Sequence, residues 1–219
     1  MELTLENLSR KYNLGIKLDE SERFYTGKNR EEMRLKFVQS GMKNKCSFFA
    51  KEIKRIVKEE FGITIKARAT HYKRIDVIIE KTKDELFKNF EELTKDERQE
   101  LYCCMRLHCE ELNGISEETA RLYYENIQKN RVVNSEFLKD ENKLLEDFIE
   151  LLMESWNYDH TGAFMGDCDY DDADFYGFVF FEATDQLACC CDTKFGMLYN
   201  LILAAKNDDE LREIIKSNI

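Results

Sequence analysis

Apolar residues recur at helical spacing along most of the chain. Between residues 46 and 61, Phe49, Ile53, Ile56 and Val57 follow the i, i+4, i+7, i+8 pattern of an amphipathic helix, and Gly62 is a suitable residue to end it. Residues 141–156 carry the most hydrophobic pattern of this kind. We predict helices over both ranges, with further helical segments between residues 82 and 130 and after residue 184.

Strict alternation of apolar and polar residues indicates strands. In residues 63–69, Ile63 and Ile65 point to one side, and Lys66 and Arg68 point to the other. Two further apolar runs, residues 74–80 and 175–181, have the length and composition of strands. The pattern therefore predicts an α+β fold that is mainly helical and contains a small antiparallel sheet, with strands near 63–69, 74–80 and 175–181.

The predicted elements suggest how the chain is divided. We expect residues 1–40 to be an N-terminal extension and residues 41–219 to form one α+β domain, with a helical insertion at residues 82–155. The chain has 219 residues, of which 43% are hydrophobic and 35% charged, and it has no proline. This composition is typical of a folded protein with long uninterrupted helices.

The eight cysteines would indicate disulfides only in a secreted protein. The first residues contain neither a basic nor an apolar leader segment, and no stretch reaches the ~18 apolar residues of a membrane span. We therefore expect a cytoplasmic protein with reduced thiols and no membrane contact.

Charge is distributed unevenly along the chain. The formal net charge is −11. Residues 43–74 nevertheless hold ten lysines and arginines against three carboxylates, whereas residues 156–192 hold nine carboxylates and no lysine or arginine. Such asymmetry bears on the choice of partners rather than on the fold.

Two blocks of the sequence together resemble a known family. The first comprises Phe49-Ala50-Lys51-Glu52-Ile53-Lys54, Gly62-Ile63-Thr64-Ile65-Lys66-Ala67-Arg68 and Arg74-Ile75-Asp76-Val77, and the second comprises Trp156-Asn157-Tyr158-Asp159-His160 and Asp172-Ala173-Asp174-Phe175-Tyr176-Gly177-Phe178-Val179. In this order they are similar to the large polyvalent protein-associated domain 29 family. The match covers about two fifths of the chain. The resemblance implies a protein of a phage or other mobile genetic element, and it implies no enzymatic activity.

A cluster of aspartates is the first candidate site: Asp167, Asp169, Asp171, Asp172 and Asp174. Its spacing imitates the start of an EF-hand loop, but Asp172 stands where that loop needs glycine, and Phe178 where it needs glutamate. The default interpretation is a solvated acidic loop. An irregular Ca²⁺ or Mg²⁺ site is an alternative, and so is a surface that imitates the phosphates of a nucleic acid.

Cys104 and His108 form a second candidate, because residues four apart share one face of a helix and can bind one metal ion. The remaining ligands would have to come from Cys168 or from residues 189–191, and no C-x-x-C pair is present. We expect no cofactor, with zinc and calcium as the weaker alternatives.

The sequence contains no Gly-rich phosphate loop, no H-E-x-x-H and no nucleophile signature. The leading hypothesis is therefore a non-catalytic, anti-CRISPR-like protein that binds a host defence complex. Its contact residues would be the five aspartates, with Lys66 and Arg68 as the opposite pole. One alternative is a nucleic-acid-binding accessory domain that uses the basic face of residues 43–74. The other is a metal-dependent enzyme at Asp167–Asp174.

Overall fold

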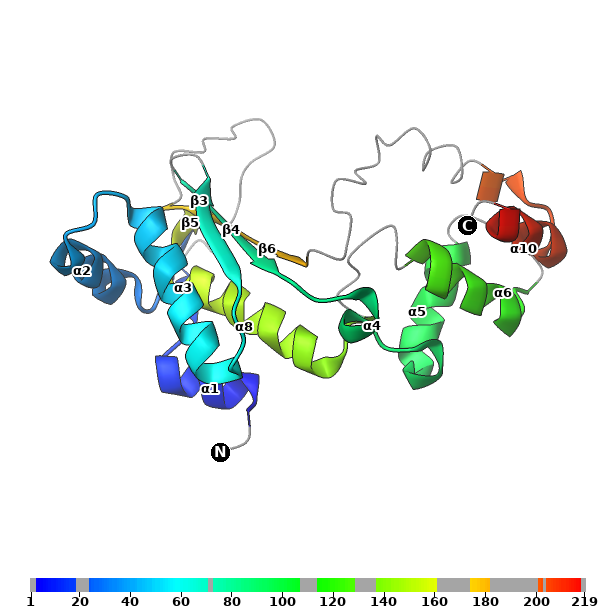
Figure 1. The fold of residues 1–219 in the computed structure, drawn as a ribbon, viewed down its shortest axis with the longest axis horizontal. Helices are drawn as coiled ribbons and strands as arrows, with labels where there is room; N and C mark the ends of the chain where they lie inside the picture. The colour runs from blue at the N-terminus through cyan, green and yellow to red at the C-terminus, as the bar shows by residue number, and fades with distance from the viewer. Residues whose placement is uncertain are drawn as a thin grey trace. The chain divides into compact units, whose positions relative to one another are not determined.

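The chain folds into two compact units, one of residues 1–80 and 141–180 and the other of residues 81–140 and 181–219. A computed structural model describes residues 3–18, 24–70, 73–106, 114–128, 137–160, 174–181, 201–202 and 204–217 (Figure 1). The fold is α+β and mainly helical, as the sequence patterns predicted. Among the helices of the described ranges, none combines the length and hydropathy needed to cross a lipid bilayer.

The first unit begins with a small sheet that had no clear sequence signal. Its strands are β1 (Ile16–Leu18), β2 (Phe24–Gly27) and β5 (Tyr158–His160), and β2 pairs antiparallel with both of its neighbours. Two helices accompany it, α1 (Leu5–Tyr12) and α2 (Arg30–Ser40). Because β2 pairs with β5, residues 1–40 are part of this unit rather than a separate extension.

The second sheet of the unit contains β3 (Lys66–Thr70), β4 (Arg74–Ile79) and β6 (Tyr176–Phe181), in the order β3-β4-β6. Antiparallel pairing places Arg68 opposite Asp76 and Ala67 opposite Val77. Residues opposite one another point to the same side of a sheet. The buried Ala67, Ile75 and Val77 therefore face the core, and Lys66 and Arg68 lie on the other face.

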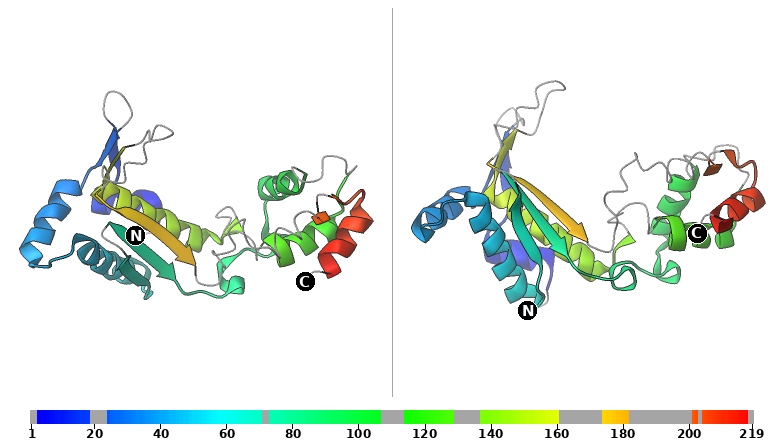
Figure 2. Two further views of the ribbon diagram at one scale, coloured as in Figure 1. Left: turned by 90° about the horizontal axis from the view of Figure 1, so that it is seen from above. Right: turned by 45° about the horizontal axis from the view of Figure 1, so that its top comes forward.

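Two helices of 17 residues cover the core face of this sheet, α3 (Lys45–Phe61) and α8 (Asp140–Trp156) (Figure 2). Asn44 caps the start of α3 by accepting a hydrogen bond from the Ser47 backbone N–H. The buried ring of Phe49 lies 5.6 Å from Trp156 and 5.2 Å from Phe175, measured between ring centres. This aromatic cluster joins α3, α8 and the residue that precedes β6 in one core.

Close backbone packing also fixes α8 against the first sheet. Gly27 lies so near the end of α8 that a Cβ atom there would sit 2.3 Å from the Ser155 backbone. The Gly27 N–H donates to the Asn157 carbonyl at 2.8 Å, and the Asn29 N–H donates to the Ser155 carbonyl at 2.9 Å. Only glycine permits this approach at residue 27.

The second unit is helical. It contains α4 (Lys83–Leu86), a 3-10 turn η1 (Phe90–Glu92), α5 (Lys95–Arg106), α6 (Glu117–Leu122), a π-helical segment η2 (Tyr123–Gln128) and α10 (Asp208–Ser217). Its core includes Phe90, Tyr124 and Phe137. An isolated bridge joins Phe87 to Leu138. Residues 141–155, which we assigned to the helical insertion, group instead with the first unit, where they form most of α8.

Candidate functional site

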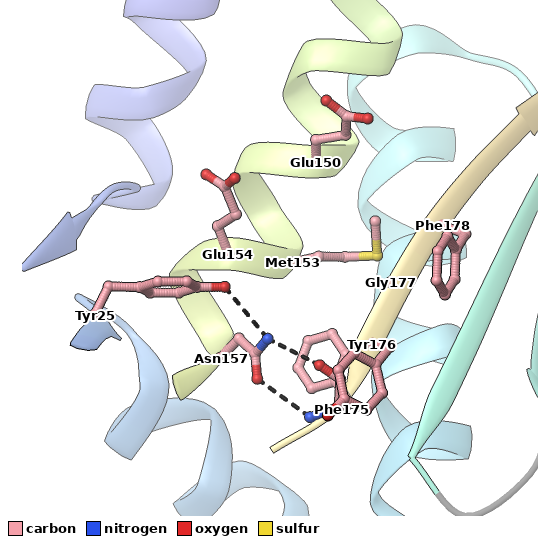
Figure 3. Close-up of a pocket in the computed structure, with 9 residues that line it drawn as sticks. All are labelled: Tyr25, Glu150, Met153, Glu154, Asn157, Phe175, Tyr176, Gly177 and Phe178. Carbon is pink, nitrogen blue, oxygen red and sulfur yellow. Dashed lines mark hydrogen bonds between the residues drawn. The ribbon is translucent and has the colours of Figure 1, made fainter. Parts of the chain in front are cut away.

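A surface pocket of about 360 Å³ opens between α8 and β6 in the first unit (Figure 3). Its wall contains two carboxylates and several aromatic rings. The lining residues are Tyr25, Glu150, Met153, Glu154, Asn157, Phe175, Tyr176, Gly177 and Phe178. Three of them, at 150, 153 and 154, share one face of α8 at i, i+3, i+4 spacing, and Asn157 follows directly after the helix ends.

The Asn157 side chain ties β6 to α8. Its Nδ2 donates to the Phe175 carbonyl at 2.9 Å, and its Oδ1 accepts from the Phe175 N–H at 3.2 Å. Nδ2 also lies 3.4 Å from the Tyr25 hydroxyl oxygen, as the dashed lines in Figure 3 show. Because Asn157 is buried and its amide is engaged on both sides, its role is to hold the pocket together rather than to bind a ligand.

Glu150 and Glu154 supply the charge of the pocket. Among the described residues, no lysine or arginine forms an ion pair with either carboxylate. Partial burial raises the pKa of Glu154, and burial together with Asp147 raises the pKa of Glu150. Lys143 offsets part of the rise at Glu150, but neither carboxylate has a lysine or arginine within ion-pair distance in the described part of the chain.

One turn earlier on α8, Glu146 is almost completely buried, with 8% of its surface exposed. Its Oε2 has no hydrogen-bond partner, and the nearest cation is Lys143 Nζ at 4.0 Å. Burial, reinforced by the charge of Glu150, raises the pKa of Glu146 to about 7. Glu146, Glu150 and Glu154 thus form an acidic stripe along α8 whose buried end is partly protonated near neutral pH.

Aromatic rings form the other walls of the pocket. Phe178 is 42% exposed, which is high for a phenylalanine. Its ring stacks on Phe180 with centres 6.0 Å apart, and the Arg74 guanidinium lies over it at 4.5 Å. Tyr25 and Tyr176 contribute further rings. Because Arg74 already occupies the face of Phe178, the attraction for a further positively charged group comes mainly from the two carboxylates.

The pocket does not have the ligands of a metal site. In the described ranges, no group of three or more His, Cys, Asp or Glu side chains has the geometry to hold a metal ion. Cys104 lies in α5, but its side chain and His108 fall outside the described residues, as do Cys168 and residues 189–191. The predicted zinc pair thus stays untested.

Of the five predicted contact aspartates, only Asp174 is described, because Asp167, Asp169, Asp171 and Asp172 fall outside the described residues. The Asp174 side chain is 15% exposed. It accepts hydrogen bonds from Arg30 and, at 2.7 Å, from Lys45. Burial alone would raise the pKa of Asp174, but these two cations lower it. Its charge is thus balanced within the unit, and it adds little to an anionic surface.

The basic residues of 43–74 do not form one continuous face. Lys66 and Arg68 are exposed on the open side of the sheet, and Lys66 forms an ion pair with Glu80. The exposed Lys54 and Lys58 lie on the side of α3 that points away from the sheet. α3 covers the face of the sheet opposite to Lys66 and Arg68. The sheet and α3 therefore lie between Lys66 and Arg68 on one side and Lys54 and Lys58 on the other.

No protein-family model, no curated protein sequence and no solved structure matches the chain. The resemblance to the large polyvalent protein-associated domain 29 family therefore stays a prediction from the two sequence blocks.

The pocket residues were not among the sites predicted from the sequence. One signal was present, because Glu146, Glu150 and Glu154 interrupt the most hydrophobic helix at intervals of four residues. A repeated carboxylate on an otherwise apolar helix indicates one polar stripe. Tyr25 gave no such signal, since it reaches the pocket only through the pairing of β2 with β5.

Proposed function

We propose that this chain is a non-catalytic binding protein whose first unit holds a lysine or arginine side chain of a partner protein in the α8–β6 pocket. The observation that carries the proposal is the pair of carboxylates, Glu150 and Glu154, which have no ion-pair partner among the described residues and line a pocket that also contains aromatic residues. A bound cation would lower the electrostatic free energy of these groups, whose pKa values are raised in the free protein.

The long-range charge favours the same class of partner. A net charge of −11 attracts basic proteins and raises their rate of association. The pocket also has the composition of an interaction site, since aromatic residues and methionine are enriched at the centres of protein interfaces. A lysine or arginine side chain would place its methylene groups against the apolar lining of the pocket, such as Met153, and reach the carboxylates with its charged end.

A host defence nuclease is the narrower partner class that we propose. Its nucleic-acid channel is lined by lysine and arginine, and the sequence resemblance implies a mobile genetic element. The part of the original hypothesis that concerns Asp167–Asp172 stays a separate prediction, because the pocket lies on α8 and β6 and does not depend on those residues.

Binding of short peptides to the full chain tests the proposal. A fluorescein-labelled peptide with one central lysine should bind, and the same peptide with norleucine in place of lysine should not, because norleucine keeps the methylenes and removes the charge. The variant Glu150→Gln/Glu154→Gln should weaken binding at least tenfold, since a hydrogen bond to a charged group contributes about 1.5–3 kcal/mol.

The matched control is Glu6→Gln/Glu31→Gln, which removes two exposed carboxylates from the same unit and should leave binding unchanged. Equal binding of the lysine and norleucine peptides would refute a cation site. Binding of single-stranded DNA or RNA that is lost in Arg68→Ala, but unchanged in Glu150→Gln/Glu154→Gln, would favour the nucleic-acid alternative instead.

A further inference from the structure

The strand next to the pocket, β6, is at the edge of its sheet. In the order β3-β4-β6, the described strands give it a neighbour on one side only. Its sequence, Tyr-Gly-Phe-Val-Phe-Phe, contains no charged residue and no proline. Proteins commonly protect edge strands with such residues, because an open edge pairs readily with another extended segment.

The backbone groups of β6 alternate between the two edges. The Tyr176 N–H donates to the carbonyl of Lys73, immediately before β4. Successive residues of a strand direct their N–H and C=O groups to opposite edges, so those of Gly177 and Val179 point away from β4. Figure 3 shows that Tyr25 and Glu154 lie on this same side of β6. The outward backbone groups and the pocket therefore share one edge.

Side chains alternate in the same way between the two faces. At Gly177, a Cβ atom would point at Met153 of α8, with 2.3 Å to its sulfur. A residue paired directly opposite Gly177 would point to the same face. Its side chain would then project toward α8, where Glu150 and Glu154 lie. Its two neighbours in sequence would point to the open face, beside Phe178.

We propose that the partner segment binds in extended conformation as an additional strand on the edge of β6, along the outward backbone groups of Gly177 and Val179. Its lysine or arginine would lie opposite Gly177 and enter the pocket, and the residues before and after it would be apolar or aromatic and contact the exposed ring of Phe178. Backbone hydrogen bonds to Gly177 and Val179 supply affinity, and the charged side chain supplies specificity. This inference rests on the proposed function and specifies the conformation of its ligand.

Peptides methylated on backbone nitrogens separate this mode from simple capture of a cation. The parent peptide has seven residues, with a central lysine and alternating valine and threonine. Two N-methylated forms of it are compared, one methylated on the odd-numbered amides and the other on the even-numbered amides. An added strand directs only one of these sets toward β6. One isomer should therefore lose at least tenfold in affinity for the full chain, and the other should bind within about threefold of the parent peptide.

Amide hydrogen exchange of the full chain gives a second measurement. Addition of the parent peptide should slow exchange at Gly177 and Val179, because both N–H groups become hydrogen-bonded. If both methylated isomers bind as the parent does, and Glu150→Gln/Glu154→Gln still abolishes binding, the added strand is refuted and the cation pocket stands. If the parent peptide does not bind at all, the proposed function fails, and this inference fails with it.

Discussion

Glu146 should make this protein less stable as the pH rises through neutrality. The residue is 8% exposed, and its Oε2 has no hydrogen-bond partner. Burial raises its pKa from the ordinary value of 4.5 to about 7. The folded state therefore keeps a proton on Glu146 in a pH range where the unfolded chain has already lost it.

The sign and size of the effect follow from this shift. Stabilisation by the protonated side chain is fully present below pH 4.5 and is lost as the pH rises through about 7. At 1.36 kcal/mol per pKa unit, the loss amounts to about 3 kcal/mol. The variant Glu146→Gln keeps a neutral group of similar shape. It should therefore be more stable than the wild type at pH 8 by about 2–3 kcal/mol, with little difference at pH 5.

Urea unfolding at pH 5 and pH 8 measures the effect, followed by the fluorescence of the single tryptophan, Trp156, which is buried in the same unit. The control variant Glu31→Gln alters an exposed carboxylate and should retain the pH dependence of the wild type. If Glu146→Gln lost the same free energy of unfolding between pH 5 and pH 8 as the wild type, the carboxylate would not be buried as described.

Two further predictions concern stability. Gly27→Ala should lower the free energy of unfolding by about 3 kcal/mol or more, because the new Cβ would lie 2.3 Å from the Ser155 backbone. The control Gly41→Ala, at a position with open space but a φ of +67°, should lower it by only about 1 kcal/mol. Equal losses in the two variants would contradict the close approach at Gly27. Burial alone would raise the pKa of Asp208, but hydrogen bonds from Ser116 and Arg212 lower it to about 2. The stabilisation by ionised Asp208 is thus present above pH 3.8 and lost as the pH falls toward 2. Asp208→Asn should therefore be less stable than the wild type at pH 7 by about 2 kcal/mol, measured by chemical denaturation. An unchanged stability at pH 7 would refute the lowered pKa of Asp208.

Local patterns predicted the main helices and strands well. The apolar stripe at 49, 53, 56 and 57 and the glycine at 62 matched α3, which ends at Phe61 with Gly62 in the left-handed conformation. The apolar run at 175–181 matched β6, which spans Tyr176–Phe181. In such segments, the spacing of apolar residues alone decides which surface must be buried.

Short strands and remote pairings were missed. β1 and β5 have three residues each, too few to show a period. β2 pairs with β5 across more than 130 residues of sequence, Phe24 with His160. No local pattern reports such a contact, because its stability comes from hydrogen bonds formed only after both segments are brought together. This pairing is also what makes the first 40 residues part of the first unit.

Charge counts along the sequence do not show on which surface each charge lies. Counting placed ten cations in residues 43–74, yet α3 and the sheet direct them to different sides. Asp174 was counted with four other aspartates, but Arg30 and Lys45 balance its charge. Which charges remain available to a partner depends on ion pairs between residues far apart in sequence, such as residues 30 and 174.

Local spacing and composition were enough to predict an α+β, mainly helical chain, the extents of its longest helices and an overall acidic charge. The folded structure was needed to show that Tyr25, Glu150, Glu154 and Phe178 line one pocket beside an edge strand. A pocket is a property of packing. Its residues come from three elements, and they become neighbours only when burial of the apolar core brings α8, β2 and β6 together.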